Sequence, residues 1–204
     1  MSLLLIFGLV SVASPSRAIS HNGFDISNAT VPRNEILAGG PPRDGIPSID
    51  QPRFIIPGAA DYLHEDDLVV SVQLEGTTRA YPLRILVWHE IVNDVIGTRP
   101  IAVTYCPLCG TAMVFDRKIN GRTHTFGVSG LLYQSDVLMY DRETESLWSQ
   151  LAMKAISGSR AGTELRLLAA DQQTWRAWRG KHPNGEVLSS QTGYSRDYGQ
   201  NAYS

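Results

Sequence analysis

The sequence has few cysteines, no excess of charge of one sign and no apolar run long enough to cross a membrane. Two cysteines among 204 residues cannot form a disulfide scaffold or a four-cysteine metal site. Lys and Arg (18) nearly balance Asp and Glu (20), so the net charge of −2 does not favour binding to nucleic acid. There is no internal repeat, no H-E-x-x-H and no G-x-S-x-G, which removes support for solenoids, zincin-type proteases and serine hydrolases.

The most apolar stretch lies at the N-terminus. Residues 3–13 are apolar but too short to span a bilayer, and Ser16 and Ala18 suit the small-residue positions before a signal-peptidase cut. We therefore predict a signal peptide over residues 1–18 and an exported mature chain, periplasmic or extracellular, with no transmembrane span. The segment before this cut carries no Lys or Arg up to Ser16, so a first helix of the fold stays open as an alternative.

Residues 19–58 predict an extended N-terminal strap. Gly39-Gly40-Pro41-Pro42 and the following Gly45 and Pro47 are too rich in Gly and Pro for regular structure. A disordered linker is the alternative interpretation. Residues 59–204 predict the folded domain, and together these segments indicate a single strand-dominated α+β domain with a few short helices.

Turn and cap signals divide residues 59–204 into short elements. A hairpin at 68–74 and 77–81 precedes a helix that is expected to begin after Pro82 and to run over 83–93. Strands are expected at 101–105, at 111–117 and 122–128 around the turn Asn120-Gly121, and at 137–140 and 164–168. Thr174 is expected to cap a short helix that ends near His182.

The motif Cys106-Pro107-Leu108-Cys109-Gly110 is the strongest chemical signal. A C-P-x-C-G turn can point two thiolates at one ion, with Gly supplying the positive φ of the turn. A structural disulfide, or two buried free thiols, is the second interpretation. A redox pair is the third, although a strand pattern follows the motif and so no helix dipole would stabilise a thiolate.

A third ligand is expected from the helix after Pro82. His89 shares a helix face with apolar residues and with Asn93, and the following strand brings Cys106 back towards it. Glu90 or Asn93 would then orient the site, and Met113 lies close to the cysteines along the chain. Thiolate and imidazole ligands suit Cu(I) or Zn(II).

A polar cluster follows the cysteines. Hydroxyl, carboxylate and amide groups beside an aromatic ring can line a pocket, or can equally cap turns. The candidate pocket residues are Ser129, Ser135, Asp136, Ser146, Trp148 and Gln150.

Several motifs together carry a family resemblance. They are Gly39-Gly40-Pro41-Pro42-Arg43-Asp44-Gly45-Ile46-Pro47, Ala80-Tyr81-Pro82-Leu83, Trp88-His89-Glu90-Ile91-Val92-Asn93-Asp94, Thr104-Tyr105-Cys106-Pro107-Leu108-Cys109-Gly110-Thr111, Phe126-Gly127-Val128-Ser129-Gly130-Leu131-Leu132 and Tyr140-Asp141-Arg142. With these motifs the chain resembles the prokaryotic family called domain of unknown function 3179, from about residue 38 to the end. The resemblance implies no established reaction. It implies a closing segment beyond residues 192–198, which we expect this chain to lack in part.

The leading hypothesis is an exported metal-binding protein that holds Cu or Zn with Cys106, Cys109 and His89. A thiol–disulfide redox protein using the same cysteines is the second hypothesis. The third is a non-catalytic envelope binding module in which the cysteines are bridged. No enzymatic reaction, protein partner or small ligand is assigned by the residues alone.

Overall fold

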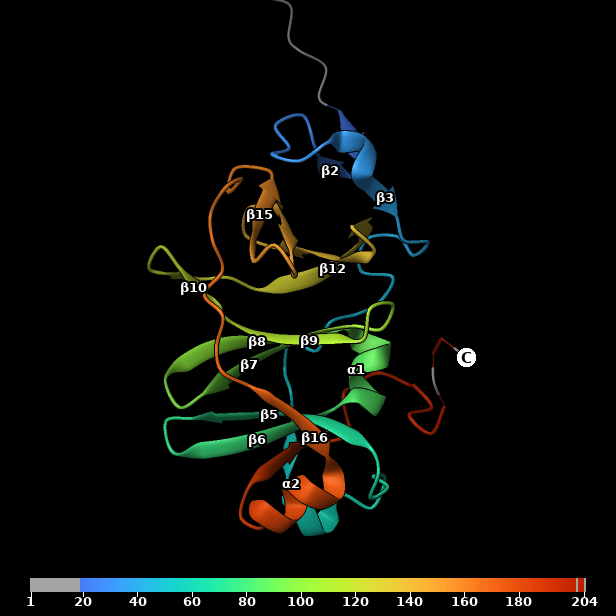
Figure 1. Cartoon of the computed structure of the whole chain (residues 1–204), viewed down its shortest axis with the longest axis vertical. Helices are drawn as coiled ribbons and strands as arrows, with labels where there is room; N and C mark the ends of the chain where they lie inside the picture. The colour runs from blue at the N-terminus through green and yellow to red at the C-terminus, as the bar shows by residue number, and fades with distance from the viewer. Residues whose placement is uncertain (1–18, 201, 204) are drawn as a thin grey trace, which may run out of the picture.

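A computed structural model describes residues 19–200, 202 and 203, and its longer strands form three stacked sheets (Figure 1). The predicted signal peptide at residues 1–18 lies outside the described residues. The strands are β1 (Ser20–His21), β2 (Phe24–Asp25), β3 (Ile36–Ala38), β4 (Phe54–Ile55), β5 (Leu68–Leu74), β6 (Thr77–Pro82), β7 (Ile91–Ile96), β8 (Arg99–Cys106), β9 (Thr111–Asp116), β10 (Lys118–Ile119), β11 (Arg122–Thr123), β12 (Phe126–Tyr133), β13 (Asp136–Asp141), β14 (Leu147–Ser149), β15 (Lys154–Ser157), β16 (Asp171–Thr174) and β17 (Glu186–Leu188). The helices are α1 (Leu83–His89), α2 (Trp175–Lys181) and the short turns η1 (Arg33–Glu35) and η2 (Pro57–Ala59).

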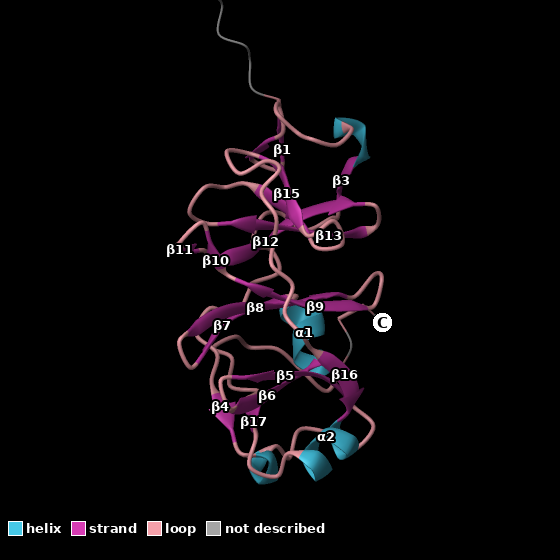
Figure 2. Cartoon of the chain, turned by 60° about the vertical axis from the view of Figure 1, so that its left-hand side comes forward, coloured by secondary structure: helices cyan, strands magenta, loops and turns pink. Residues whose placement is uncertain are grey.

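Each of the three sheets has its own set and order of strands. The upper sheet has the order β15-β14-β13-β12-β3, the central sheet β7-β8-β9, and the lower sheet β16-β5-β6-β17-β4. Neighbouring strands pair antiparallel, except that β17 pairs in parallel with β6, and β1-β2 and β10-β11 form separate hairpins. Figure 2 shows α1 between the central and lower sheets and α2 beneath the lower sheet. The chain is thus strand-rich and consistent with the predicted α+β class.

Alternation along β8 explains how the central sheet holds its neighbours. Ile101 and Val103 point into the apolar layer shared with the lower sheet, whereas Ala102 and Cys106 point into the layer shared with the upper sheet. Successive side chains of a strand face opposite sides, so one strand serves two cores. Cys106 therefore sits between the central and upper sheets, at the end of β8.

The predicted strap is ordered and ties the three layers together. Leu37 in β3 pairs with Leu132 of the upper sheet, Ile49 bridges to Val92 of the central sheet, and β4 pairs with β17 of the lower sheet. Pairings from this segment thus reach all three sheets.

The helix after Pro82 is shorter than predicted. α1 ends at His89, Glu90 adopts a φ of 57° as the C-cap, and β7 begins at Ile91. The β-branched residues that follow, Ile91 and Val92 among them, favour a strand. Glu90, with its positive φ, turns the chain from the helix into this strand. Asn93 is consequently on β7, so the predicted helix face that it shared with His89 does not exist.

Other predicted elements are partly confirmed. The hairpin of β5 and β6 is present, and Thr174 caps α2 through a hydrogen bond that its Oγ1 accepts from the Ala177 N–H. Asn120-Gly121 forms the expected turn, but only between the short β10 and β11, because β9 and β12 belong to different sheets. Residues 164–168 make isolated bridges instead of a strand. No helix in the described part of the chain is long and apolar enough to cross a bilayer.

Candidate functional site

The two cysteines lie in the turn that joins β8 to β9. Cys106 pairs with Thr111 at the last position of the ladder, and Gly110 has the positive φ (66°) expected for this turn. Both cysteines are free, Cys106 buried and Cys109 exposed. The turn lies on the same side of the molecule as α1 and the C-terminal segment (Figure 1). As predicted, a strand and not a helix follows the motif.

Asp136 of the upper sheet completes a three-residue donor cluster with the cysteines. One ligand atom from each of Cys106, Cys109 and Asp136 lies within 4.8 Å of the other two. The Cys109 Sγ lies 3.3 Å from the Asp136 Oδ1, and the Asp136 Oδ2 accepts a hydrogen bond from the Leu151 N–H. Asp136 is fully buried. The stacking of the upper sheet on β8 therefore creates this cluster, which we call the thiol–carboxylate cluster.

A small cavity adjoins the thiol–carboxylate cluster. Its volume is about 60 Å³, and Glu90, Cys106 and Tyr203 line it together with the strap and the bulge of β12. The Tyr203 O–H donates to the Glu90 Oε1 at 2.8 Å. Burial raises the pKa of Glu90 to about 7, and burial also raises the pKa of the Cys106 thiol, helped by the adjacent Cys109. Burial thus favours the neutral forms of Glu90 and Cys106.

The raised pKa of Glu90 makes stability depend on pH. The carboxyl has a pKa near 4.5 in the unfolded chain and about 7 in the folded, metal-free protein, so the folded state binds more protons between these values. Stability should therefore fall as pH rises from 4.5 to 7, by up to about 3 kcal/mol. Glu90→Gln should remove this loss.

Urea unfolding of reduced, metal-free protein at pH 5 and pH 8 measures the effect. The wild type should lose more stability between these two values than Glu90→Gln does. Equal pH dependence of the two proteins would show that the Glu90 carboxyl is already ionised at low pH in the folded state.

His89 is not part of the thiol–carboxylate cluster. Its Nδ1 donates to the Pro47 carbonyl and its Nε2 accepts from the Tyr198 O–H, both at 2.7 Å. Burial lowers the pKa of His89, which favours this neutral form. Both ring nitrogens are therefore engaged in joining α1 to the strap and to the C-terminal segment. Asp136, and not His89, is the third member of the group of possible ligands around the two cysteines.

Asn93 and Met113 also lie in structural positions. The Asn93 carboxamide accepts from the Phe126 N–H and donates to the Phe126 carbonyl and to Asp50, so it fastens β7 to β12. Met113 is half-buried on β9 against the apolar layer that contains Cys106. Neither side chain joins the donor cluster.

The predicted polar pocket separates into several places. The Ser129 hydroxyl bonds the Leu138 carbonyl and the Leu131 N–H within the bulge of β12, and Ser135 is exposed in the turn before Asp136. Ser146 accepts from the Arg160 N–H. Only Asp136 reaches the cysteines, so the predicted set does not form one pocket.

Trp148 and Gln150 are buried in the upper sheet. The Trp148 indole donates to Asp141, and the Gln150 Nε2 donates to Thr104 and to the Thr111 carbonyl beside the cysteine turn. Within the described part of the chain, the buried Gln150 Oε1 has no hydrogen-bond partner. Gln150 thus supports the base of the turn.

A second group of possible ligands, separate from the cysteines, contains His124. The His124 Nδ1 lies 3.2 Å from the Asp141 Oδ1 and 3.6 Å from the Glu143 Oε2. Asp141 also accepts from the Thr144 N–H and hydroxyl and from Trp148. These donors satisfy the buried Asp141 carboxylate and explain the group as a cap of the β13–β14 turn.

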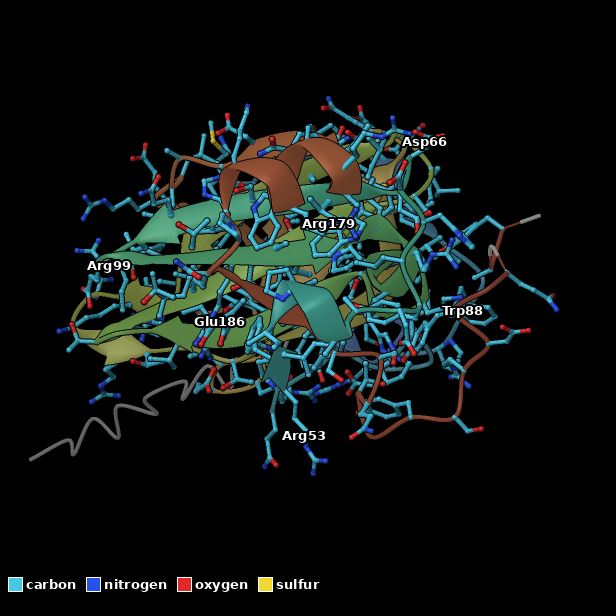
Figure 3. All side chains as sticks on the ribbon, turned by 90° about the horizontal axis from the view of Figure 1, so that it is seen from below. Arg53, Asp66, Trp88, Arg99, Arg179 and Glu186 are labelled. Carbon is cyan, nitrogen blue, oxygen red and sulfur yellow. The ribbon has the colours of Figure 1, made fainter. Side chains whose placement is uncertain are left out.

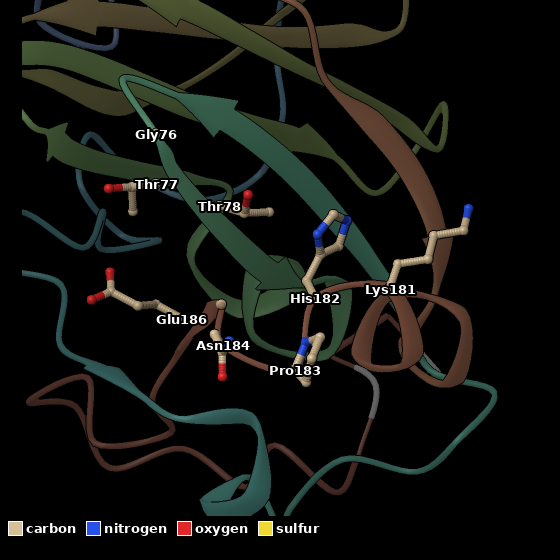
Figure 4. Close-up of a pocket in the computed structure, with 9 residues that line it drawn as sticks. Gly76, Thr77, Thr78, Lys181, His182, Pro183, Asn184 and Glu186 are labelled. Atoms are coloured by element: carbon tan, nitrogen blue, oxygen red, sulfur yellow. The ribbon is translucent and has the colours of Figure 1, made fainter.

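A polar hollow between the β5–β6 turn and the segment after α2 gathers side chains of both charges. Its volume is about 390 Å³, and Thr77, Lys181, His182 and Glu186 are among its lining residues (Figure 4). None of these residues belongs to either group of possible metal ligands among the described residues. The cysteine turn therefore remains the candidate site.

Comparison with known proteins places the chain in a family. It matches the family described as "Protein of unknown function (DUF3179)" over residues 43–204, which is more than half of its length. A search of the curated proteins and a search of the solved structures each found no match. The matched range includes the cysteine turn, Glu90 and Asp136. The chain therefore belongs to the DUF3179 family of proteins of unknown function.

Proposed function

We propose that this protein is an exported zinc-binding protein whose protein ligands are Cys106, Cys109 and Asp136. The observation that carries the proposal is the convergence of these three donors within 4.8 Å of one another. A zinc ion with ligands at about 2.0–2.3 Å places tetrahedral donors roughly 3.3–3.8 Å apart. Small rotations of the side chains would bring the three donors to this spacing.

Charge supports a cation at this position. Two thiols and the carboxyls of Asp136 and Glu90 lie in or beside the thiol–carboxylate cluster. Among the described residues, no Lys or Arg forms an ion pair with either carboxyl. Without a cation, burial keeps the Cys106 and Glu90 pKa values high. A bound divalent ion would lower these pKa values and would release protons from the thiols on binding.

The donor set favours zinc over copper. Zn(II) accepts both thiolate and carboxylate ligands, whereas Cu(I) prefers thiolate, thioether and imidazole. With Asp136 in place of His89, the set contains a hard oxygen donor that suits Zn(II) better. Of copper and zinc, zinc is thus the metal that we propose.

The cavity beside Cys106 offers a place for water as a fourth ligand. Cys106 lines the cavity of about 60 Å³, which could hold about two water molecules. Three protein donors with one water are the pattern of zinc sites that lower the pKa of water. Glu90 lines the same cavity and could exchange a proton with such a water.

The Asp136→Asn variant tests the third ligand. It should lower the zinc affinity at least tenfold, because a neutral amide is a poorer zinc donor than a carboxylate. Titration calorimetry of the reduced protein with zinc measures this. Asp116→Asn, which removes another buried carboxyl outside the cluster, and His89→Gln should each change the affinity of the folded protein less than twofold. If His89→Gln weakens zinc binding and Asp136→Asn does not, the ligand set proposed here is wrong.

A thiol–disulfide redox role is a second candidate. The observation that favours it is the difference in exposure, since Cys109 is accessible to a partner and Cys106 is buried behind it. A non-reducing mass measurement distinguishes a bridged, metal-free protein from a reduced one that holds zinc. If it is bridged, a midpoint potential below about −300 mV indicates a structural bridge and a higher value indicates exchange.

Export is proposed from the N-terminal sequence. The mature chain should begin near Ile19, because Ser16 and Ala18 suit signal-peptidase cleavage. Cell fractionation followed by N-terminal sequencing measures this directly. Cytosolic protein that retains Met1 would contradict the proposal.

A further inference from the structure

A groove on the surface shares part of its lining with the cavity at the thiol–carboxylate cluster. It has a volume of about 320 Å³, and Pro41, Ile46, Val87, Trp88 and Arg196 are among the residues that line it. Gly39, Pro41, Ile46 and Tyr203 line both the groove and the cavity. We call this surface the Trp88 groove. A molecule bound in it could extend one end towards Cys106.

The walls and the charge of the Trp88 groove specify an occupant. Pro41, Ile46 and Val87 are apolar, so they favour an apolar body. Arg196 is exposed, its guanidinium lies 5.8 Å from the centre of the Trp88 ring, and its NH1 donates to the Ser195 carbonyl at 3.4 Å. No carboxylate of the described residues forms an ion pair with Arg196. A guanidinium in this setting suits a carboxylate, which it can bind with two parallel hydrogen bonds.

We infer that the Trp88 groove binds a small carboxylate with an apolar chain, whose carboxylate meets Arg196 and whose other end enters the cavity beside Cys106. The volume is at the lower end of the range for small-molecule sites, which fits a ligand of this size. Placing the inner end of the ligand beside zinc rests on the proposed function. Binding in the groove does not depend on the metal.

Trp88 reports on this binding. Its side chain is half-buried and its indole N–H donates to the Gln200 carbonyl at 3.1 Å, whereas Trp148, Trp175 and Trp178 are buried in the core. Figure 3 shows Trp88 beside the C-terminal segment and Arg179 on α2, away from it. Arg179 also lies over an indole, that of Trp175, at 6.0 Å. It therefore offers a matched control for Arg196.

An NMR titration of ¹⁵N-labelled protein with hexanoate, followed through the indole N–H signals, tests the inference. The Trp88 signal should shift with saturation, and the other three indole signals should stay in place. Hexanamide, which has the same shape without the charge, should bind at least tenfold more weakly. Arg196→Gln should weaken hexanoate binding at least tenfold, and Arg179→Gln should leave it unchanged.

Three results would overturn the inference. They are the absence of a saturable Trp88 shift, equal binding of hexanamide and hexanoate, and unchanged hexanoate binding in Arg196→Gln. The same titration of Cys106→Ser separates the groove from the metal. Hexanoate should still bind to this variant. Loss of zinc binding would therefore leave the groove proposal standing, and loss of hexanoate binding would leave the zinc proposal standing.

Discussion

Cys106→Ser and Cys109→Ser should each abolish stoichiometric zinc binding, whereas the wild type should hold about one ion per chain. A serine hydroxyl does not ionise near neutral pH and therefore cannot replace a thiolate ligand. We expect the zinc affinity to fall by about a hundredfold or more, because two donors alone hold the ion weakly. Elemental analysis after dialysis, with titration against a zinc indicator, measures the loss.

A matched control and thiol labelling make this result specific. Ser135→Ala changes an exposed residue directly before Asp136 and should keep full zinc content. Labelling of Cys109 in the wild type should rise when a chelator removes the ion. A wild-type protein that carries an intact bridge and no zinc would transfer support to the redox or structural interpretation.

Gly130→Ala should lower the free energy of unfolding by about 4 kcal/mol or more. Gly130 has a φ of 72° at the bulge of β12, and a Cβ there would lie 2.2 Å from the Pro41 carbonyl oxygen. The Gly130 carbonyl also accepts from the Gly39 N–H at 2.8 Å. The added methyl would push the strap away from the upper sheet and widen the cavity beside Cys106.

Gly162→Ala separates backbone strain from the clash. Gly162 has a similar φ of 86°, but a Cβ there meets no atom within 4 Å. It should cost only about 1 kcal/mol, the strain of a left-handed residue. Urea unfolding of the two variants measures the difference. Equal losses would mean that the strap does not lie tightly against Gly130.

The sequence predicts the parts of the site that depend on local patterns. The C-P-x-C-G turn, the strand that ends at Cys106 and the strand after Gly110 follow from alternation and turn chemistry. The length of α1 could not be predicted from the sequence pattern. Glu90 ends this helix with a positive φ, which few non-glycine residues adopt. The error in this one boundary placed His89 and Asn93 on a common face that the structure lacks.

Asp136 is recognisable as a polar residue, but its role depends on long-range stacking. It lies 27 positions beyond Cys109, in a different sheet, and meets the cysteine only because the upper sheet covers β8. The partners of His89 are similar, since Tyr198 is 109 positions away. Periodicity along one strand carries no information about which sheet will cover it, so sequence spacing favoured the nearby His89 over the distant Asp136.

X-ray absorption at the zinc edge of the reduced, zinc-loaded protein reads out the ligands of the proposed site. We expect two sulfur neighbours at about 2.3 Å and lighter oxygen neighbours at about 2.0–2.2 Å, with Asp136→Asn changing the lighter shell alone. A spectrum with only nitrogen and oxygen neighbours, unchanged in Cys106→Ser, would contradict the proposed site.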